Sequence, residues 1–209
     1  MNIQPLLEKA ARGHHHLCPR QILGVRMGLL GLQNLGYETP PEKKFIYIIS
    51  ETDGCFVDGL TAATHCSLGH RTMRIEDYGK VAAVFVDVVT GKTVRIAPTL
   101  DVRQKAYAYA PSESRRYFAQ MQAYQVMPDT EMFTVTPVLL NMPIQSIISR
   151  SGVRVNCDHC GEEIMNEREI HANGMTLCQA CAHGGYYQPA GQNLSYRTLN
   201  LRTHDQSRL

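Results

Sequence analysis

Hydrophobic and polar positions along the chain alternate between helical and strand periodicities, without a strict repeat. Apolar residues recur at helical spacing over residues 3–11 and 19–35, and Gly36 supplies a natural left-handed end for the second of these helices. Apolar runs bounded by turn residues predict strands over 44–49, 71–75, 81–88 and 93–96, with weaker candidates over 132–140 and 145–149. A short helix is predicted after Cys55, and another over 112–125 with Ser112 as its cap. This pattern predicts an α+β fold with a mixed, largely antiparallel sheet packed with helices.

Three glycines lie on one stripe of the helix predicted over residues 19–35. Gly24, Gly28 and Gly31 recur at helical spacing, although each glycine inside a helix costs about 0.8–1 kcal/mol relative to alanine. We therefore expect another backbone to approach this face closely.

A histidine and a cysteine converge on the start of the same helix. Pro19 suits the first helical position, which leaves Cys18 at the cap, where the positive end of the helix favours the thiolate. A neutral imidazole from His16 is a common companion of such a thiolate in metal sites. Cys55 begins the next short helix, three residues before Asp58, so the two share a helical face. The alternative is that these cysteines are simply small buried residues.

Four further cysteines carry the most specific signal in the chain. Cys157, Cys160, Cys178 and Cys181 form two Cys-x2-Cys units separated by 17 residues, and Gly161 permits the tight turn after the first unit. Four thiolates at this spacing favour a closed tetrahedral Zn²⁺ site, with an iron–sulfur cluster as the alternative. A segment this short buries little apolar area, so a small C-terminal zinc-finger module would owe its folding to the metal.

Charge and cysteine content narrow the expected partners and compartment. The formal net charge is only +2, and residues 153–209 carry five Lys and Arg against six Asp and Glu, so nucleic acid is not the expected partner of the finger. Seven cysteines, four of them in paired units, favour metal ligation in a reducing compartment, and no long apolar run predicts a membrane span. We expect a cytoplasmic protein with an α+β domain at 1–152, a zinc finger at 153–190 and a tail at 191–209.

Three segments of the first domain together resemble a known family. Residues 13–27 (GHHHLCPRQILGVRM), 51–69 (ETDGCFVDGLTAATHCSLG) and 77–85 (DYGKVAAVF) resemble the FmdE family, named after the molybdenum formylmethanofuran dehydrogenase operon. The four-cysteine segment is similar to the DksA/TraR-like finger that many members append. The resemblance implies an α+β protein, often a dimer, in which His16, Cys18, Cys55 and, as a further candidate, Cys66 share one metal pocket. His15, Arg20, Gly59 and His65 depart from the family pattern.

The expected function is a metal-binding protein with a Cys/His metal or thiol site in its N-terminal domain and a structural zinc finger. We expect a second divalent metal, Zn²⁺ by preference, at Cys18, Cys55 and His16, with Cys18, Cys55 and Asp58 as catalytic candidates. Whether Cys66, His14, His15 or His65 join this site stays open. A homodimer and a molybdoenzyme partner, which the chain would serve as a redox or accessory protein, are the expected associations. The alternative function is a zinc-finger regulatory or assembly protein without catalytic activity.

Overall fold

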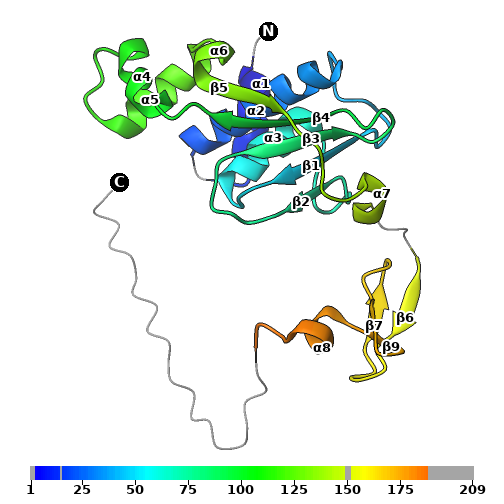
Figure 1. Cartoon of the computed structure of the whole chain (residues 1–209). Helices are drawn as coiled ribbons and strands as arrows, with labels where there is room; N and C mark the ends of the chain where they lie inside the picture. Colours follow the sequence, from blue (N-terminus) through cyan, green and yellow to red (C-terminus); the bar gives the residue numbers. More distant parts are fainter. Residues whose placement is uncertain (1–2, 15, 149–151, 188–209) are drawn as a thin grey trace, which may run out of the picture. The chain divides into compact units, whose positions relative to one another are not determined.

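The computed structural model describes residues 3–14, 16–148 and 152–187 and divides into two units after Ile148 (Figure 1). The first unit is built on a five-stranded sheet of order β2-β1-β3-β4-β5. Its strands are β1 (Ile46–Ser50), β2 (Met73–Ile75), β3 (Ala83–Asp87), β4 (Thr93–Pro98) and β5 (Phe133–Pro137). β1 and β2 are parallel, whereas every other neighbouring pair is antiparallel. The prediction of a mixed, largely antiparallel sheet is thus confirmed.

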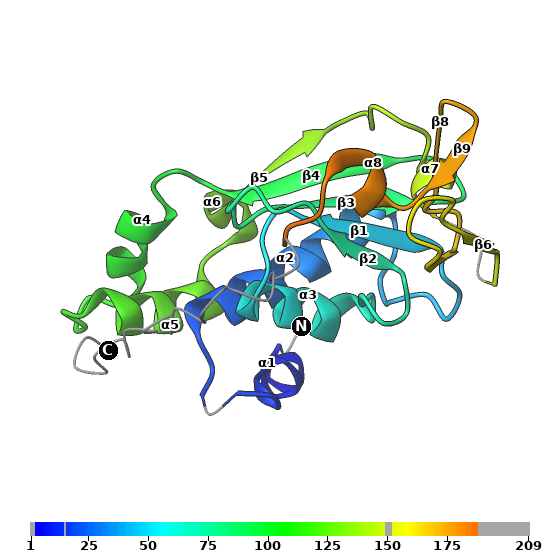
Figure 2. The same ribbon diagram turned by 90° about the horizontal axis from the view of Figure 1, so that it is seen from below.

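Helices cover the sheet unequally. The helices of this unit are α1 (Gln4–Ala11), α2 (Pro19–Leu35), α3 (Cys55–Thr64), α4 (Val102–Tyr109), α5 (Arg116–Val126), α6 (Asp129–Met132) and α7 (Ile144–Ile147). α1, α2 and α3 lie on one face of the sheet (Figure 2), where Ile46 and Ile48 of β1 join the main core. Tyr47 and Ile49 point to the other face, where they pack with Ile144 of α7. Alternate residues of β1 are therefore buried on opposite faces, as the period of a strand requires.

α2 occupies the predicted residues, and its first turn shows why. Pro19 takes the first helical position, and the buried Gln21 accepts a hydrogen bond from the backbone N–H of Cys18 at 2.8 Å. The amide group of Gln21 also donates to the Ala10 carbonyl at 2.9 Å, which fixes the start of α2 against α1. Gly36, at φ 96°, ends the helix in the left-handed conformation.

The glycine stripe of α2 is where α3 crosses it. A Cβ atom added to Gly24 would lie 2.3 Å from the Phe56 carbonyl oxygen, and one added to Gly59 would lie 2.3 Å from the Gln21 carbonyl oxygen. The two backbones thus approach through Gly24 and Gly59, which confirms the expected close contact. Gly28 faces the Ala63 side chain and Gly31 faces the Phe85 ring, so side chains fill the remainder of the stripe.

The second half of the first unit departs from the sequence prediction in three places. α5 begins at Arg116, after Arg115, and Ser112 does not cap it. α4 was not predicted because only Val102 and Ala106 are buried on an otherwise polar helix. The strand predicted over 145–149 is wrong: Pro143 caps a single helical turn there, whose Ile144 covers the sheet.

The second unit consists, over its described residues, of two small hairpins and one short helix. Its elements are β6 (Arg154–Asn156), β7 (Glu163–Met165), β8 (Ile170–Ala172), β9 (Met175–Leu177) and α8 (Gln179–His183). β6 pairs with β7 and β8 pairs with β9, both antiparallel. Between residues 152 and 187, the buried core consists only of Cys157, Ile164 and Leu177. So small a core cannot offset the entropy of ordering the chain, and a further source of stability is required.

Candidate functional site

The four predicted finger cysteines converge in the second unit. Within the described chain, Cys157, Cys160, Cys178 and Cys181 form the only group of three or more His, Cys, Asp or Glu ligand atoms that all lie within 4.8 Å of one another. Cys157 follows β6 and Cys160 precedes β7, while Cys178 follows β9 and caps α8. Gly161, at φ 77°, makes the tight turn that its position predicted.

Backbone donors and neighbouring sulfurs set the protonation of this cluster. The backbone N–H groups of Cys160 and Cys178 lower the pKa of Cys157 to about 6, the second of them donating to the sulfur at 3.3 Å. The Cys178 side chain raises the pKa of Cys181 to about 12, with burial adding to the rise. Four thiolates this close repel one another, so only a bound cation allows all of them to ionise together. The cluster therefore has the donor set and spacing of a closed metal site.

The first unit brings a second group of chemically active side chains together at the starts of two helices. Cys18 caps α2, and Cys55 is the first residue of α3, after Gly54 at φ 71°. The Cys18 side chain lies within hydrogen-bonding reach of the Cys55 thiol. The crossing at Gly24 and Gly59, one or two turns further along each helix, holds these two starts side by side.

His14 aligns with Asp58 and Cys55. Its Nε2 lies 2.8 Å from Oδ2 of Asp58, and its Nδ1 lies 4.0 Å from Sγ of Cys55. An Nε2–H that donates to the carboxylate leaves the lone pair of Nδ1 facing the sulfur. In metal sites a carboxylate commonly orients a ligand histidine in this way. Asp58 thus has the geometry of a residue that orients His14.

Burial, more than the helix dipole, governs the Cys55 thiol. Burial raises its pKa, the neighbouring Cys18 adds to the rise, and the positive charge of Arg20 only partly opposes it. The expectation that the start of a helix makes this residue a thiolate is therefore wrong for the metal-free protein. A metal ion bound here would have to displace the proton.

Tyr117 of α5 closes one side of the thiol pair and was missed as a site residue. Its hydroxyl donates to the Leu17 carbonyl at 3.1 Å, and burial followed by the charges of Cys18 and Cys55 raises its pKa. The sequence shows Tyr117 only as part of the apolar side of a helix. No local signal connects it to a cysteine about 100 residues away, because the contact is made by tertiary packing alone.

The remaining candidates lie elsewhere. His16 is exposed, and within the described residues it is His14 whose ring nitrogen faces Cys55. His15 lies outside the described residues. His65 and Cys66 follow the last residue of α3, which places them about 15 Å along the helix from Cys55. Cys66 is buried and donates to the Ile46 carbonyl at 3.6 Å, so it belongs to the core.

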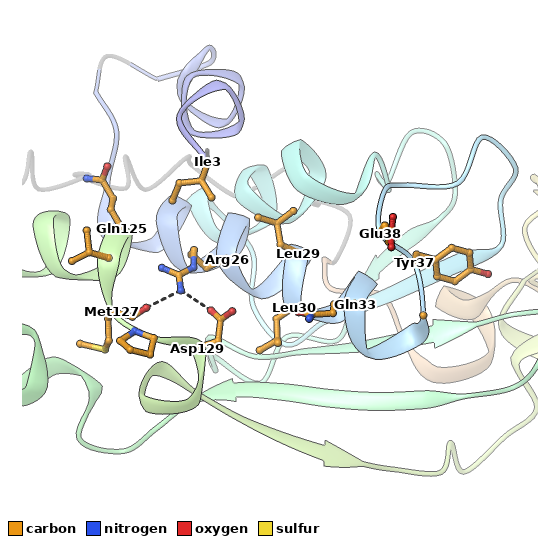
Figure 3. A pocket seen from close by; sticks show the side chains of 13 residues that line it. Ile3, Arg26, Leu29, Leu30, Gln33, Tyr37, Glu38, Gln125, Met127 and Asp129 are labelled. Atoms are coloured by element: carbon orange, nitrogen blue, oxygen red, sulfur yellow. Dashed lines mark hydrogen bonds and ion pairs between the residues drawn. The ribbon is translucent and has the colours of Figure 1, made fainter. Parts of the chain in front are cut away.

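A groove of about 750 Å³ lies along the C-terminal half of α2, away from Cys18 (Figure 3). Leu29, Leu30 and Val126 supply much of its apolar wall. Arg26 donates to the Met127 carbonyl and to Asp129, both at 2.7 Å, so its guanidinium is already engaged. This arginine is consequently not a free cation for binding an anion in the groove.

Comparison with known proteins agrees with the architecture. Residues 13–134 match the model of the family described as "FmdE, Molybdenum formylmethanofuran dehydrogenase operon". The crystal structure of an FmdE-like protein of tungsten formylmethanofuran dehydrogenase, from Syntrophus aciditrophicus, is similar, with a TM-score of 0.59 and 22% identity. The match covers 90% of this chain and 96% of that one. At this identity the likeness establishes a shared fold.

A curated relative from Archaeoglobus fulgidus is longer than this chain. It is described as a "Probable S-adenosyl-L-methionine-binding protein" and is 29% identical over 210 residues, or 90% of this chain. The match covers 55% of the relative, so the chain spans about half the length of that protein.

The described helices were also compared with the requirements of a membrane span. None of them combines the length and the apolar character that crossing a bilayer requires.

Proposed function

We propose, from the premise that this chain belongs to the FmdE family of the molybdenum formylmethanofuran dehydrogenase operon, that it is an accessory protein with two metal centres of different purpose. The centre in the second unit is structural. Four cysteine ligands without an open position fold a small module and leave no site for a substrate. Zn²⁺ is the ion that this donor set favours, and the module would be of the DksA/TraR-like kind.

The centre in the first unit is the functional one, with Cys18, Cys55 and His14 as protein ligands. The observation that carries this proposal is the alignment of Asp58, His14 and Cys55, with distances of 2.8 and 4.0 Å on the two sides of the imidazole. A carboxylate that fixes one ring nitrogen while the other faces a thiol is typical of a metal-ligating histidine. These contacts favour His14 over the predicted His16 as the imidazole ligand.

This centre is more open than the finger. Cys18, Cys55 and His14 are not among the described residues whose ligand atoms all lie within 4.8 Å of one another, and the His14 side chain is 33% exposed. A divalent ion held by these three residues would keep a position for an exogenous ligand, and it would supply Lewis-acid chemistry there. Asp58 would hold the His14 ring in place and fix its tautomer.

The associations follow from the same assignment of ligands. A metal centre open to solvent suits a protein that serves a molybdoenzyme as an accessory or redox partner, and a homodimer is the proposed assembly. All seven cysteines are unpaired, which suits a reducing cytoplasm.

Metal stoichiometry of the reduced full-length chain tests the two centres separately. We expect two bound ions per chain in the wild type and one in the Cys18→Ser, Cys55→Ser double variant. Cys66→Ser is the matched control, because this buried thiol donates to the Ile46 carbonyl, and it should keep both ions. Wild-type protein with one ion would reject the N-terminal centre and favour the alternative of a zinc-finger assembly protein.

Two nearby histidines provide a sharper test of the ligand set. His14→Gln should weaken binding at the N-terminal centre by roughly 10- to 100-fold, and Asp58→Asn should have an effect of the same order. His16→Gln should leave the affinity unchanged, because His16 is exposed and does not face Cys55. Equal effects of the two histidine variants, measured by competition with a chromophoric chelator, would contradict the assignment.

A further inference from the structure

Cys18 and Cys55 are two free thiols in side-chain contact at the starts of α2 and α3. We propose that they form a reversible disulfide that excludes the metal from the N-terminal centre. This inference rests on the metal site proposed above, and it assigns to that site a regulation by oxidation. It depends on the contact between two sulfurs, which metal binding and disulfide formation would use in different ways.

The packing around the pair favours reaction between these two sulfurs. Both residues are half-buried, and the adjoining residues His14 and His16 are exposed, so a small oxidant can reach them. The backbones of α2 and α3 meet at Gly24 and Gly59, so the two helix starts cannot easily separate. The dithiol is therefore held together before any reaction takes place, which lowers the entropic cost of closing the bond.

The other cysteine of this unit is excluded from the pair. Cys66 lies beyond the opposite end of α3, is 5% exposed, and donates to the Ile46 carbonyl. Neither access nor distance allows it to compete for Cys55.

The reaction balances as thiol–disulfide exchange with a small disulfide such as oxidised glutathione. The Cys55 thiolate attacks one sulfur of the oxidant, and the other sulfur leaves as a thiolate. Cys18 then attacks Cys55 and expels the second small thiol. Two electrons pass from the cysteine pair to the oxidant, and the two protons of the cysteines end on the two small thiols released. The product has lost both thiolates, so it retains only His14 of the three proposed ligands and cannot hold the ion.

Peptide mapping of the full-length chain detects the bond directly. Metal-free protein is treated with oxidised glutathione, alkylated and digested with trypsin, which places Cys18 in residues 13–20 and both Cys55 and Cys66 in residues 45–71. We expect these two peptides to be linked and to separate on reduction. Cys66→Ser should keep the link, whereas Cys55→Ser should abolish it.

Metal content of the same samples connects the bond to the metal centre. We expect bound ions to fall from two to one per chain on oxidation and to return to two after reduction and reloading with Zn²⁺. The double variant, treated identically, should keep its one ion and so show that the finger survives the oxidant. Prior loading of the wild type with Zn²⁺ should slow formation of the link.

The outcomes separate this inference from the proposed function. Two ions in the reduced protein, with glutathione attached singly to Cys18 or Cys55 and no linked peptide, would overturn the disulfide alone. One ion in the reduced protein would reject the metal centre, and with it the regulation, whether or not the peptides become linked.

Discussion

Asp87, at the end of β3, shows at the scale of single residues how this chain accommodates a buried carboxylate. The backbone N–H groups of Val89 and Thr90 donate to Oδ1 at 2.8 and 3.0 Å, and the Tyr37 hydroxyl donates to Oδ2 at 3.1 Å. Burial alone would raise the pKa of Asp87, but these donors outweigh it and hold the pKa below its ordinary value. The ionised form is therefore part of the folded state.

Replacing Asp87 by Asn should make stability less dependent on pH. A carboxyl whose pKa is lower in the folded than in the unfolded state stabilises the fold above its unfolded pKa of about 3.9, and this contribution is lost as the pH falls through the folded value. We expect Asp87→Asn to lower the free energy of unfolding by about 1–2 kcal/mol at pH 7, and the difference from wild type to shrink below about pH 4. Urea unfolding at several pH values measures this. The exposed Glu42→Gln is the control, and a difference independent of pH would contradict the assignment.

At the scale of elements, the crossing of α2 and α3 positions the candidate N-terminal centre. Cys18 and Cys55 lie at the helix starts, whereas the contact that fixes the angle and distance between the helices lies at Gly24 and Gly59. Because neither glycine has a side chain, the two backbones can approach closely. The geometry of the thiol pair is thus determined by residues that carry no chemistry of their own.

Gly24→Ala should destabilise the protein, although alanine normally favours a helix. The new Cβ would meet the Phe56 carbonyl oxygen at 2.3 Å, and a backbone atom cannot move aside as a flexible side chain can. We expect a loss of about 1–3 kcal/mol, in place of the gain of about 1 kcal/mol at an open helical site, together with weaker binding at the N-terminal centre. Thermal unfolding and metal titration measure the two effects. Gly13→Ala, with nothing within 4 Å of its added Cβ, should change little, and a stabilised Gly24→Ala would show that the helices are not in contact there.

At the scale of the whole molecule, the two units differ in the source of their stability. The first unit has an extended apolar core that joins its sheet to α1, α2 and α3. The described part of the second has three buried core residues, one of which is the cysteine Cys157, a proposed metal ligand. The hydrophobic effect suffices for the first unit, whereas the second depends on the bound ion.

Removal of metal should unfold the second unit and leave the first one folded. With a strong chelator under reducing conditions, we expect loss of protection from hydrogen exchange over β6 to α8, while β1, β3 and α2 remain protected. Cys157→Ser should have the same effect without a chelator, because it removes one of four ligands. Cys66→Ser serves as a control for the loss of one thiol. A second unit that stays protected after chelation would show that its hairpins are stable without metal.

Local signals in the sequence determined much of this protein. Pro19 and Gly36 define both ends of α2, the apolar runs define β1 and β3, and the spacing of the four finger cysteines defines their cluster. Each of these features depends on residues close together in the chain or on a spacing that only one geometry satisfies. The sequence was misleading where a short apolar run suited either periodicity, as over residues 145–149, where a single helical turn caps the sheet.

Only the tertiary structure decided which residues share the N-terminal site. The sequence predicts a histidine near Cys18 but does not distinguish among three neighbouring imidazoles, and the contacts with Cys55 and Asp58 of α3 select His14. Tyr117 joins from a helix about 100 residues away, and Cys66 is removed by the length of α3. The physical reason is that periodicity and caps act within a few residues, whereas the meeting of α2, α3 and α5 depends on how their buried faces pack together.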